Sequence, residues 1–167
     1  LLKVIEEPQS TIHIFLLTNQ EEAVLPTIKS RTQIISFPQN LPYLERFLEE
    51  EGLLKTQASL IARLVSSQEE AKRLATNKSF IDLLDQAKKF TELLLTDSNR
   101  AYLQVGVLVP LAVEKAEQGR LFDVLSLLLA ERLTEMIARE KMDGVLKAKK
   151  MWQANVSLQN CLEYLTM

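Results

Sequence analysis

Turn-forming residues are scarce in this sequence. Its 167 residues include four glycines and five prolines, and two of the prolines, Pro8 and Pro26, fall within the first 26 positions. Because glycine and proline mark most turns, the rest of the chain has few places to reverse direction, and we expect a mostly helical body. A chain of this length forms one large or two small domains and buries roughly 70% of its unfolded surface.

Cysteine and histidine each occur once, as Cys161 and His13. An intrachain disulfide needs two cysteines, and a structural zinc site needs about four ligands, so we expect neither a disulfide nor a metal site. A single thiol is typical of a reducing compartment, and we therefore expect a cytoplasmic protein.

Long apolar runs and an excess of one charge are also missing. The 20 basic and 22 acidic residues give a net charge of −2, so no overall field draws the chain to nucleic acid or a membrane. The longest apolar run, Val105 to Val113, contains Pro110 and is far shorter than the ~20 residues of a membrane-spanning helix. We expect no membrane association.

A phosphate-binding loop of the type G-x-x-x-x-G-K-[ST] is absent from the sequence. The chain also begins inside a helical pattern, without a methionine or a helix-starting signal. We therefore expect a fragment of a longer protein, whose preceding part carries the earlier strands of an α/β core.

What the sequence does contain begins with a helical stretch, LLKVIEEP, and a predicted strand over Ile12–Leu17. This strand is apolar on both faces, which is typical of a covered strand in a parallel sheet. It ends in the polar pair Thr18-Asn19, at the sheet edge that faces ligands in α/β folds.

A short helix and a second strand are predicted next. After Glu21-Glu22, Pro26 suits the first turn of a helix that ends at Lys29-Ser30-Arg31. The second strand is predicted over Gln33–Phe37, closed by Pro38.

These segments together resemble the end of the ATPase core of bacterial clamp-loader subunits, which belong to the AAA+ superfamily. The resemblance rests on LLKVIEEPQS, the FLLTN strand and LPTIKSRTQ, about a quarter of the chain. The Ser-Arg-Cys motif of that family appears here as Ser30-Arg31-Thr32, with threonine in the third position.

The resemblance implies that Arg31, with Ser30, forms an arginine finger offered to ATP-Mg on a neighbouring subunit. A guanidinium is permanently charged and donates in parallel to phosphate oxygens. The alternative is a surface arginine that caps a short helix. Thr18 and Asn19 match the sensor position, where a polar side chain orients water or the γ-phosphate; the alternative there is a strand-to-loop cap. No cofactor is expected in this chain itself.

Beyond the core, the sequence favours helices. Residues 1–39 are read as the carboxyl-terminal remnant of the α/β core, and residues 40–78 as a three-helix domain that resembles the superfamily's lid. Its helices are predicted over Pro42–Glu51, which Gly52 ends, over Leu54–Val65, and after a cap at Ser66.

Residues 79–167 are expected to form a helical collar that joins subunits. Ser79 is predicted to cap its first helix, Thr96–Asn99 to begin the second, and Pro110 to kink or divide that one. The most apolar helix is predicted over Leu121–Lys141, covered on more than one side, with a break at Asp143-Gly144 before the last helical region.

Other candidate residues have simpler interpretations. Glu6 and Glu7 point about 100° apart on a helix and cannot share one proton. His13 is read as a structural imidazole within its strand, and Cys161 as a buried apolar residue. The lysines at 147, 149 and 150, followed by Trp152, could contact DNA, but a solvated helix face is the preferred interpretation.

The resemblance also implies partners. It implies a hetero-pentamer with gamma/tau and delta subunits that loads the sliding clamp onto primed DNA, in which this chain is a subunit that does not hydrolyse ATP. One alternative is the ATP-hydrolysing gamma/tau subunit, which an upstream phosphate loop would favour. Another is an unrelated helical scaffold, which would associate with no clamp-loader subunit.

Overall fold

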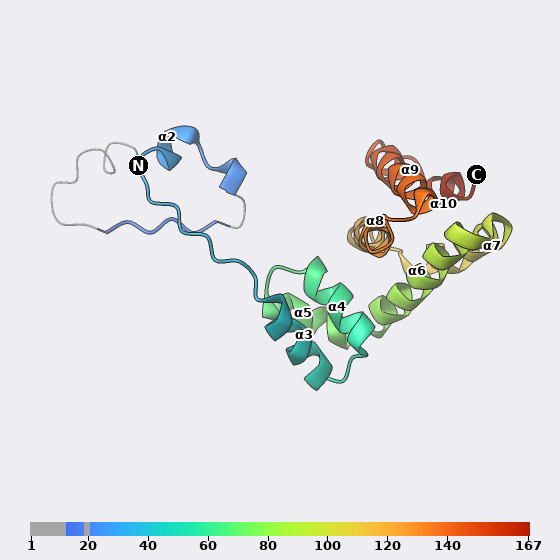
Figure 1. Ribbon diagram of the computed structural model, residues 1–167, viewed down its shortest axis with the longest axis horizontal. Coiled ribbons are helices and arrows are strands. Elements are labelled where there is room, and N and C mark those ends of the chain that lie inside the picture. Colours follow the sequence, from blue (N-terminus) through green and yellow to red (C-terminus); the bar gives the residue numbers. More distant parts are fainter. Residues whose placement is uncertain (1–12, 19–20) are drawn as a thin grey trace. The chain divides into compact units, whose positions relative to one another are not determined.

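The computed structural model describes residues 13–18 and 21–167, and the chain divides into two compact units, Leu1–Gln39 and Asn40–Met167 (Figure 1). Every regular element in the described residues is helical, which confirms the prediction of a mainly α protein. In chain order these elements are the 3-10 turn η1 (Glu21–Ala23), α2 (Pro26–Lys29), α3 (Leu41–Glu50), α4 (Lys55–Leu64), α5 (Gln68–Thr76), α6 (Lys78–Thr96), α7 (Ser98–Leu108), the 3-10 turn η2 (Val109–Leu111), α8 (Lys115–Ala130), α9 (Met136–Gln153) and α10 (Leu158–Leu165).

The first unit contains no strand in its described residues, so the prediction of two strands is wrong for these residues. Residues 13–17 and 33–37 are irregular and exposed, and Phe15 and Phe37 are 84% and 85% exposed. Ile12 lies outside the described residues. A strand needs a neighbour to satisfy its backbone N–H and C=O groups, and no ladder forms here. His13 is exposed in this segment, so its predicted structural role inside a strand is wrong as well.

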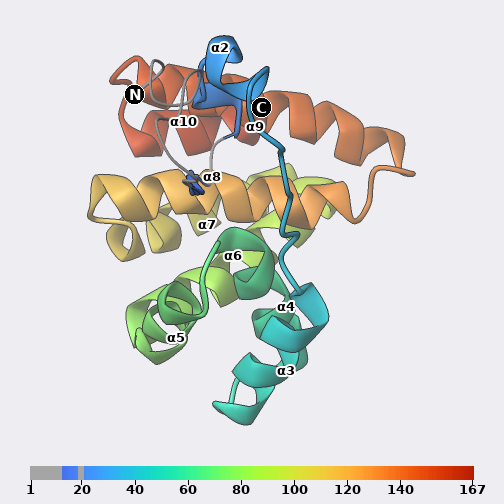
Figure 2. The same cartoon turned by 90° about the vertical axis from the view of Figure 1, so that its left-hand side faces the viewer.

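The second unit is organised around α8. Leu121, Phe122, Val124, Leu125 and Leu129 are all fully buried. Helices α4, α6 and α9 each pack against α8, and Figure 2 shows α8 lying between α9 and α6. The prediction that this helix is covered on more than one side is confirmed.

The end of α8 differs from the prediction. The expected helix over Leu121–Lys141 breaks after Ala130, and the expected break at Asp143-Gly144 lies inside α9. The five-residue turn contains neither glycine nor proline. Backbone hydrogen bonds close it, from the Arg132 N–H to the Leu129 carbonyl at 3.0 Å and from the Glu135 N–H to the Arg132 carbonyl at 2.9 Å. The Arg132 guanidinium also donates to both carboxylate oxygens of Glu135 at 2.8 and 3.1 Å. No turn-forming residue signalled this break.

Helix caps are predicted to within one or two residues. Ser67, not Ser66, accepts from the Glu70 N–H at 3.2 Å to begin α5. Asn77, not Ser79, accepts from the Phe80 N–H at 3.2 Å to begin α6. Short polar side chains at these positions satisfy N–H groups that have no partner within the helix.

Two further predictions of helix ends are confirmed. The positive φ of Gly52 (98°) follows the end of α3, as expected of a glycine that stops a helix. Pro110 divides its helix, since α7 ends at Leu108 and Pro110 lies in η2.

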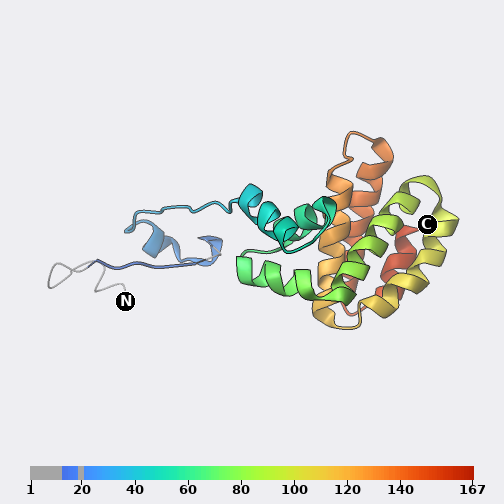
Figure 3. The ribbon, with the colours of Figure 1, turned by 90° about the horizontal axis from the view of Figure 1, so that it is seen from below.

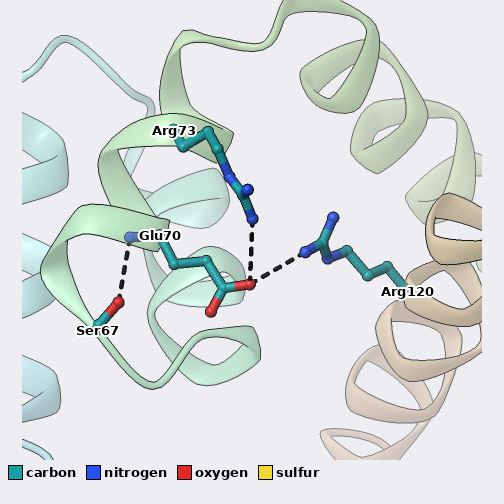
Figure 4. Close-up of polar contacts among 4 residues, drawn as sticks. All are labelled: Ser67, Glu70, Arg73 and Arg120. Carbon is teal, nitrogen blue, oxygen red and sulfur yellow. Dashed lines mark hydrogen bonds and ion pairs between the residues drawn. The ribbon is translucent and has the colours of Figure 1, made fainter.

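Helices α3, α4 and α5 pack on one another (Figure 3), and α4 contacts α8 while α5 contacts α6. The Arg120 guanidinium on α8 lies 3.0 Å from a carboxylate oxygen of Glu70 on α5, and Arg73 lies 3.7 Å from the same oxygen (Figure 4). Gln57 on α4 donates to the Asp85 carboxylate on α6 at 3.1 Å. The predicted domain boundary at residues 78 and 79 falls inside this compact unit and stays a prediction.

None of the helices in the described residues is long and apolar enough to cross a membrane.

Candidate functional site

The segment that carries the candidate residues is built on α2. Leu25 precedes this helix without a side-chain cap, and Pro26 opens it, where a missing N–H costs nothing. The helix ends at Lys29, as the sequence predicts. Lys29 Nζ lies 3.5 Å from a carboxylate oxygen of Glu21 in η1. This ion pair joins the two ends of segment 21–29. An exposed pair of this type adds at most about 1 kcal/mol to the free energy of unfolding.

The triplet after α2 closes the helix with side-chain hydrogen bonds. Ser30 Oγ donates to the Thr27 carbonyl at 3.2 Å, and Thr32 Oγ1 donates to the Ile28 carbonyl at 3.0 Å. Arg31 Nη1 donates to the Thr27 carbonyl at 3.0 Å and to Ser30 Oγ at 3.3 Å. A helix of four residues leaves its carbonyls without partners inside the helix. Backbone N–H groups of residues 30–32 supply partners for the carbonyls of Pro26, Ile28 and Lys29, and the side chains of Ser30 and Arg31 supply those of Thr27.

The structure therefore brings Ser30 and Arg31 together at the carboxyl end of α2, on an exposed surface. The contacts correspond to the capping alternative considered for Arg31. Arg31 itself is an exposed residue. Whether Arg31 acts as a finger stays a prediction.

Thr18 is an exposed residue at the end of the irregular segment 13–18. Asn19, the other predicted sensor residue, lies outside the described residues. The sensor role of this pair likewise stays a prediction.

Thr32 is a structural residue whose role the sequence did not reveal. It stands at the position where the Ser-Arg-Cys motif has cysteine. A hydroxyl four residues after a carbonyl can bond back to it, and this local rule would have predicted the contact with Ile28.

Two members of the lysine and tryptophan cluster on α9, Lys149 and Trp152, make contacts within the fold, while the lysines at 147 and 150 are exposed. Trp152 Nε1 donates to Gln118 Oε1 at 2.8 Å, and the Trp152 ring packs against Phe122 with centroids 5.7 Å apart. Lys115 Nζ lies 5.8 Å above the same ring, and Lys149 forms an ion pair with Asp123. A tryptophan held in this way is not presented for stacking on bases, which favours the structural interpretation over DNA contact.

Cys161 is buried as predicted, and burial raises the pKa of its thiol. Cysteine nucleophiles depend on the thiolate, so this environment favours packing over reactivity. No group of three or more histidine, cysteine, aspartate or glutamate side chains in the described part of the chain is arranged to hold a metal ion.

The comparisons with known proteins match both units. A family model described as "DNA polymerase III, delta subunit" matches residues 1–41. The DNA polymerase III subunit delta' of Bacillus subtilis (strain 168) is 27% identical over 195 aligned positions, which include all of this chain. This chain is a homologue of the delta-prime subunit. The resemblance of the amino-terminal motifs to bacterial clamp-loader subunits is thereby confirmed, and the alignment extends the delta-prime relationship through the helical unit.

The chain spans 59% of the length of the delta-prime relative. No solved structure matches the chain.

Proposed function

We propose that this delta-prime homologue is a clamp-loader subunit that does not itself hydrolyse ATP. In this proposal it takes one place in a hetero-pentamer with gamma/tau and delta subunits, which opens the sliding clamp and loads it on primed DNA. The observation that carries the proposal is the alignment of the whole chain with a delta-prime subunit. An unrelated helical scaffold would share neither the amino-terminal motifs nor the alignment through the helical unit.

Each region has a distinct part in the proposed function. Residues 1–39 are the end of an AAA+ α/β core, whose strands form their ladders with the earlier strands of that core. Residues 40–78 act as the lid, and residues 79–167 as the collar that joins subunits. Arg31 is offered to ATP-Mg bound by the neighbouring gamma/tau subunit, with Ser30 holding its position, while Thr18 and Asn19 occupy the sensor position.

The geometry of α2 supports the role of Arg31. The side chains of Ser30 and Thr32, on either side of Arg31, bond to carbonyls of α2, so the direction of the backbone at Arg31 is fixed locally. A finger must be held in place before the transition state forms, because mobility there would cost ordering entropy. The guanidinium can exchange its contact with the Thr27 carbonyl for charged phosphate oxygens, which are stronger acceptors.

Arg31→Ala in the reconstituted complex tests this role. Fingers contribute about 10³ to 10⁵ in rate where one alone serves the reaction, and we expect a smaller fall because other subunits keep their own. The Arg31→Lys complex should also hydrolyse ATP more slowly than the wild type, since a single ammonium cannot donate in parallel. Arg46→Ala removes an exposed arginine from α3 and serves as the matched control.

Steady-state ATP hydrolysis and clamp loading on primed DNA are the measurements, with assembly of each variant checked by size-exclusion chromatography. Unchanged hydrolysis by an assembled Arg31→Ala complex would remove Arg31 from the mechanism.

A further inference from the structure

Helices α3–α5, here called the three-helix part, are joined to the helices that follow through one residue, Asn77. This residue ends α5, where its N–H donates to the Leu74 carbonyl at 3.1 Å. It also begins α6, where its side chain accepts from the Phe80 N–H at 3.2 Å. Its backbone (φ −84°, ψ 97°) is not helical, so α5 and α6 are separate helices. Hinges within a chain are often a few residues at the ends of elements, whose dihedral angles absorb the movement.

Polar side-chain pairs connect the three-helix part to the helices beyond Asn77. They are Glu70 with Arg120 on α8, Gln57 with Asp85 on α6, and Arg63 with Glu131 after α8. The Arg63 and Glu131 side chains are 40% and 52% exposed. Those of Glu70 and Arg120 are 28% and 29% exposed, so solvent screens this pair less. The Glu70–Arg120 pair is therefore the stronger of the two ion pairs that hold the parts together.

A cleft of about 450 Å³ lies between the three-helix part and the longer helices. Its lining includes Arg63 and Leu64 on α4, Leu127 on α8 and Met142 on α9. The contact between the two parts is therefore partly polar and partly hollow. Contacts of this type between parts of one chain permit relative movement more readily than a large apolar interface does.

Glu70 has one charged partner on each side of this contact. Arg120 Nη2 lies 3.0 Å from its Oε1 atom, and Arg73 Nη2 lies 3.7 Å from the same atom (Figure 4). Arg120 belongs to α8, whereas Arg73 stands three residues after Glu70 on α5. Residues at this spacing are neighbours on a helix surface. A movement of α5 as a rigid body separates Glu70 from Arg120 and carries Arg73 along.

Arg73 is placed to strengthen its contact with Glu70 when Arg120 withdraws. Its present distance of 3.7 Å exceeds the 2.7–3.2 Å typical of an N–H···O hydrogen bond. The Arg73 side chain is 69% exposed, so few neighbours oppose a change of rotamer. The shorter contact with Arg120 and the longer one with Arg73 are thus alternatives for one carboxylate oxygen.

Helix α5 supports the pair within it. The Glu70 N–H donates to the capping Ser67 hydroxyl at 3.2 Å, which fixes Glu70 in the first turn (Figure 4). Arg73 lies in the last turn of the same helix. A carboxylate near the start of a helix and a guanidinium near its end are both stabilised by the helix dipole. The Glu70–Arg73 pair therefore remains favourable on α5 without α8.

We propose that Glu70 exchanges Arg120 for Arg73 when the three-helix part swings away from α8 about Asn77. In the closed form, which the structure shows, Glu70 binds Arg120 and holds α5 against α8. In the open form Glu70 binds Arg73, so α5 leaves α8 without an unpaired carboxylate. The exchange makes the position of the three-helix part a conformational variable of this chain. The inference concerns the chain by itself and does not rest on the proposed function.

Two arginine substitutions test the exchange because it predicts opposite results for them. Arg120→Ala removes the partner of the closed form and should raise the ratio of open to closed molecules. Arg73→Ala removes the partner of the open form and should lower that ratio. We expect changes of about two- to five-fold, the factor that partly exposed ion pairs contribute. Arg46→Ala removes an exposed arginine from α3 and should leave the ratio unchanged.

Distances between spin labels measure the ratio in the 167-residue chain. Labels on Glu49→Cys in α3 and Lys147→Cys in α9 occupy exposed positions on the two parts, while Cys161 is buried. Pulsed dipolar spectroscopy should resolve a major closed and a minor open distance in the wild type. Circular dichroism checks folding, and Arg120→Gln, which keeps a longer side chain, replaces Arg120→Ala if that variant does not fold.

Glu70→Gln supplies the double-mutant control. In this background neither arginine substitution should change the ratio further, because the carboxylate that both guanidiniums contact is gone. Opposite shifts in the wild-type background and none in Glu70→Gln would support the exchange. A single distance in all variants, an unchanged ratio in Arg73→Ala, or shifts in the same direction for both arginines would overturn it. Equal shifts with and without Glu70 would overturn it as well.

Discussion

Phenylalanine side chains are buried in the second unit of this chain and exposed in the described part of the first. In the second unit Phe80, Phe90 and Phe122 are at most 2% exposed. In the described part of the first unit Phe15 and Phe37 are more than 80% exposed. Both units contain large apolar residues in regular patterns, so composition does not explain the difference.

The difference lies in how each element satisfies its backbone. A helix closes its hydrogen bonds within its own segment and then needs only one apolar stripe covered. A strand must find another strand before its side chains can pack on a common face. The second unit therefore completes its core with local elements, whereas segments 13–17 and 33–37 carry strand-like sequences without a ladder.

Matched phenylalanine substitutions should give the largest contrast between the units. Phe122→Ala removes a fully buried ring that packs on Trp152, and we expect it to lower the free energy of unfolding by about 3–5 kcal/mol. Phe15→Ala should change the unfolding of the helical unit by less than about 0.5 kcal/mol. Urea unfolding followed by circular dichroism measures both, and equal effects would contradict the difference in burial between Phe122 and Phe15.

Removing an ion pair from each unit should change the free energy of unfolding by less than the phenylalanine substitutions do. The Glu70 carboxylate is held by both Arg73 and Arg120, and the side chains of Glu70 and Arg120 are less than a third exposed. Glu21 meets Lys29 in the first unit with 57% of its own side chain exposed. We expect Glu70→Gln to cost up to about 1 kcal/mol in the same urea assay, and Glu21→Gln to leave the helical unit unchanged.

Salt provides the control for the ion-pair prediction. The cost of Glu70→Gln should shrink at high ionic strength, because screening weakens the pair in the wild type. A cost that does not depend on salt would assign the effect to packing of the longer side chain.

Cys161 should show the smallest effect on stability. Its raised pKa means that the folded chain holds the thiol proton to higher pH than the unfolded chain does. Stability should therefore fall slightly as pH rises from the ordinary thiol pKa toward the raised one, and should be insensitive to this group at lower pH. The rate of alkylation by iodoacetamide measures how reactive the buried Cys161 thiol is.

We expect Cys161 to react more slowly in the folded than in the urea-unfolded chain. A cysteine placed at Leu17, which is 93% exposed in the first unit, should react at a similar rate in both. Rapid alkylation of folded Cys161 would show that the helical unit opens more readily than its packing implies.

Much of the helical unit could be predicted from local chemistry. One face of α6 repeats apolar residues at helical spacing, and all of them are buried: Phe80, Leu83, Leu84, Ala87, Phe90 and Leu94. Gly52 and Pro110 interrupt helices where their backbones require it. Caps at Ser67 and Asn77 lie within one or two residues of the predicted ones, since several small polar residues stand side by side there. The turn after Ala130 could not be predicted, because it contains neither glycine nor proline and is closed by backbone hydrogen bonds and an arginine–glutamate contact.

For the candidate site, the sequence by itself determined the residues and their order. Pro26 begins α2, Lys29 ends it, and Ser30, Arg31 and Thr32 follow at spacings that reach its last carbonyls. For α7, only the tertiary structure decided which apolar residues are core and which are exposed. Apolar residues occur on more than one side of both α7 and α8. Three helices pack around α8, whereas only one side of α7 is buried. Burial depends on neighbours that come from distant parts of the chain, and a local pattern carries no information about where those neighbours lie.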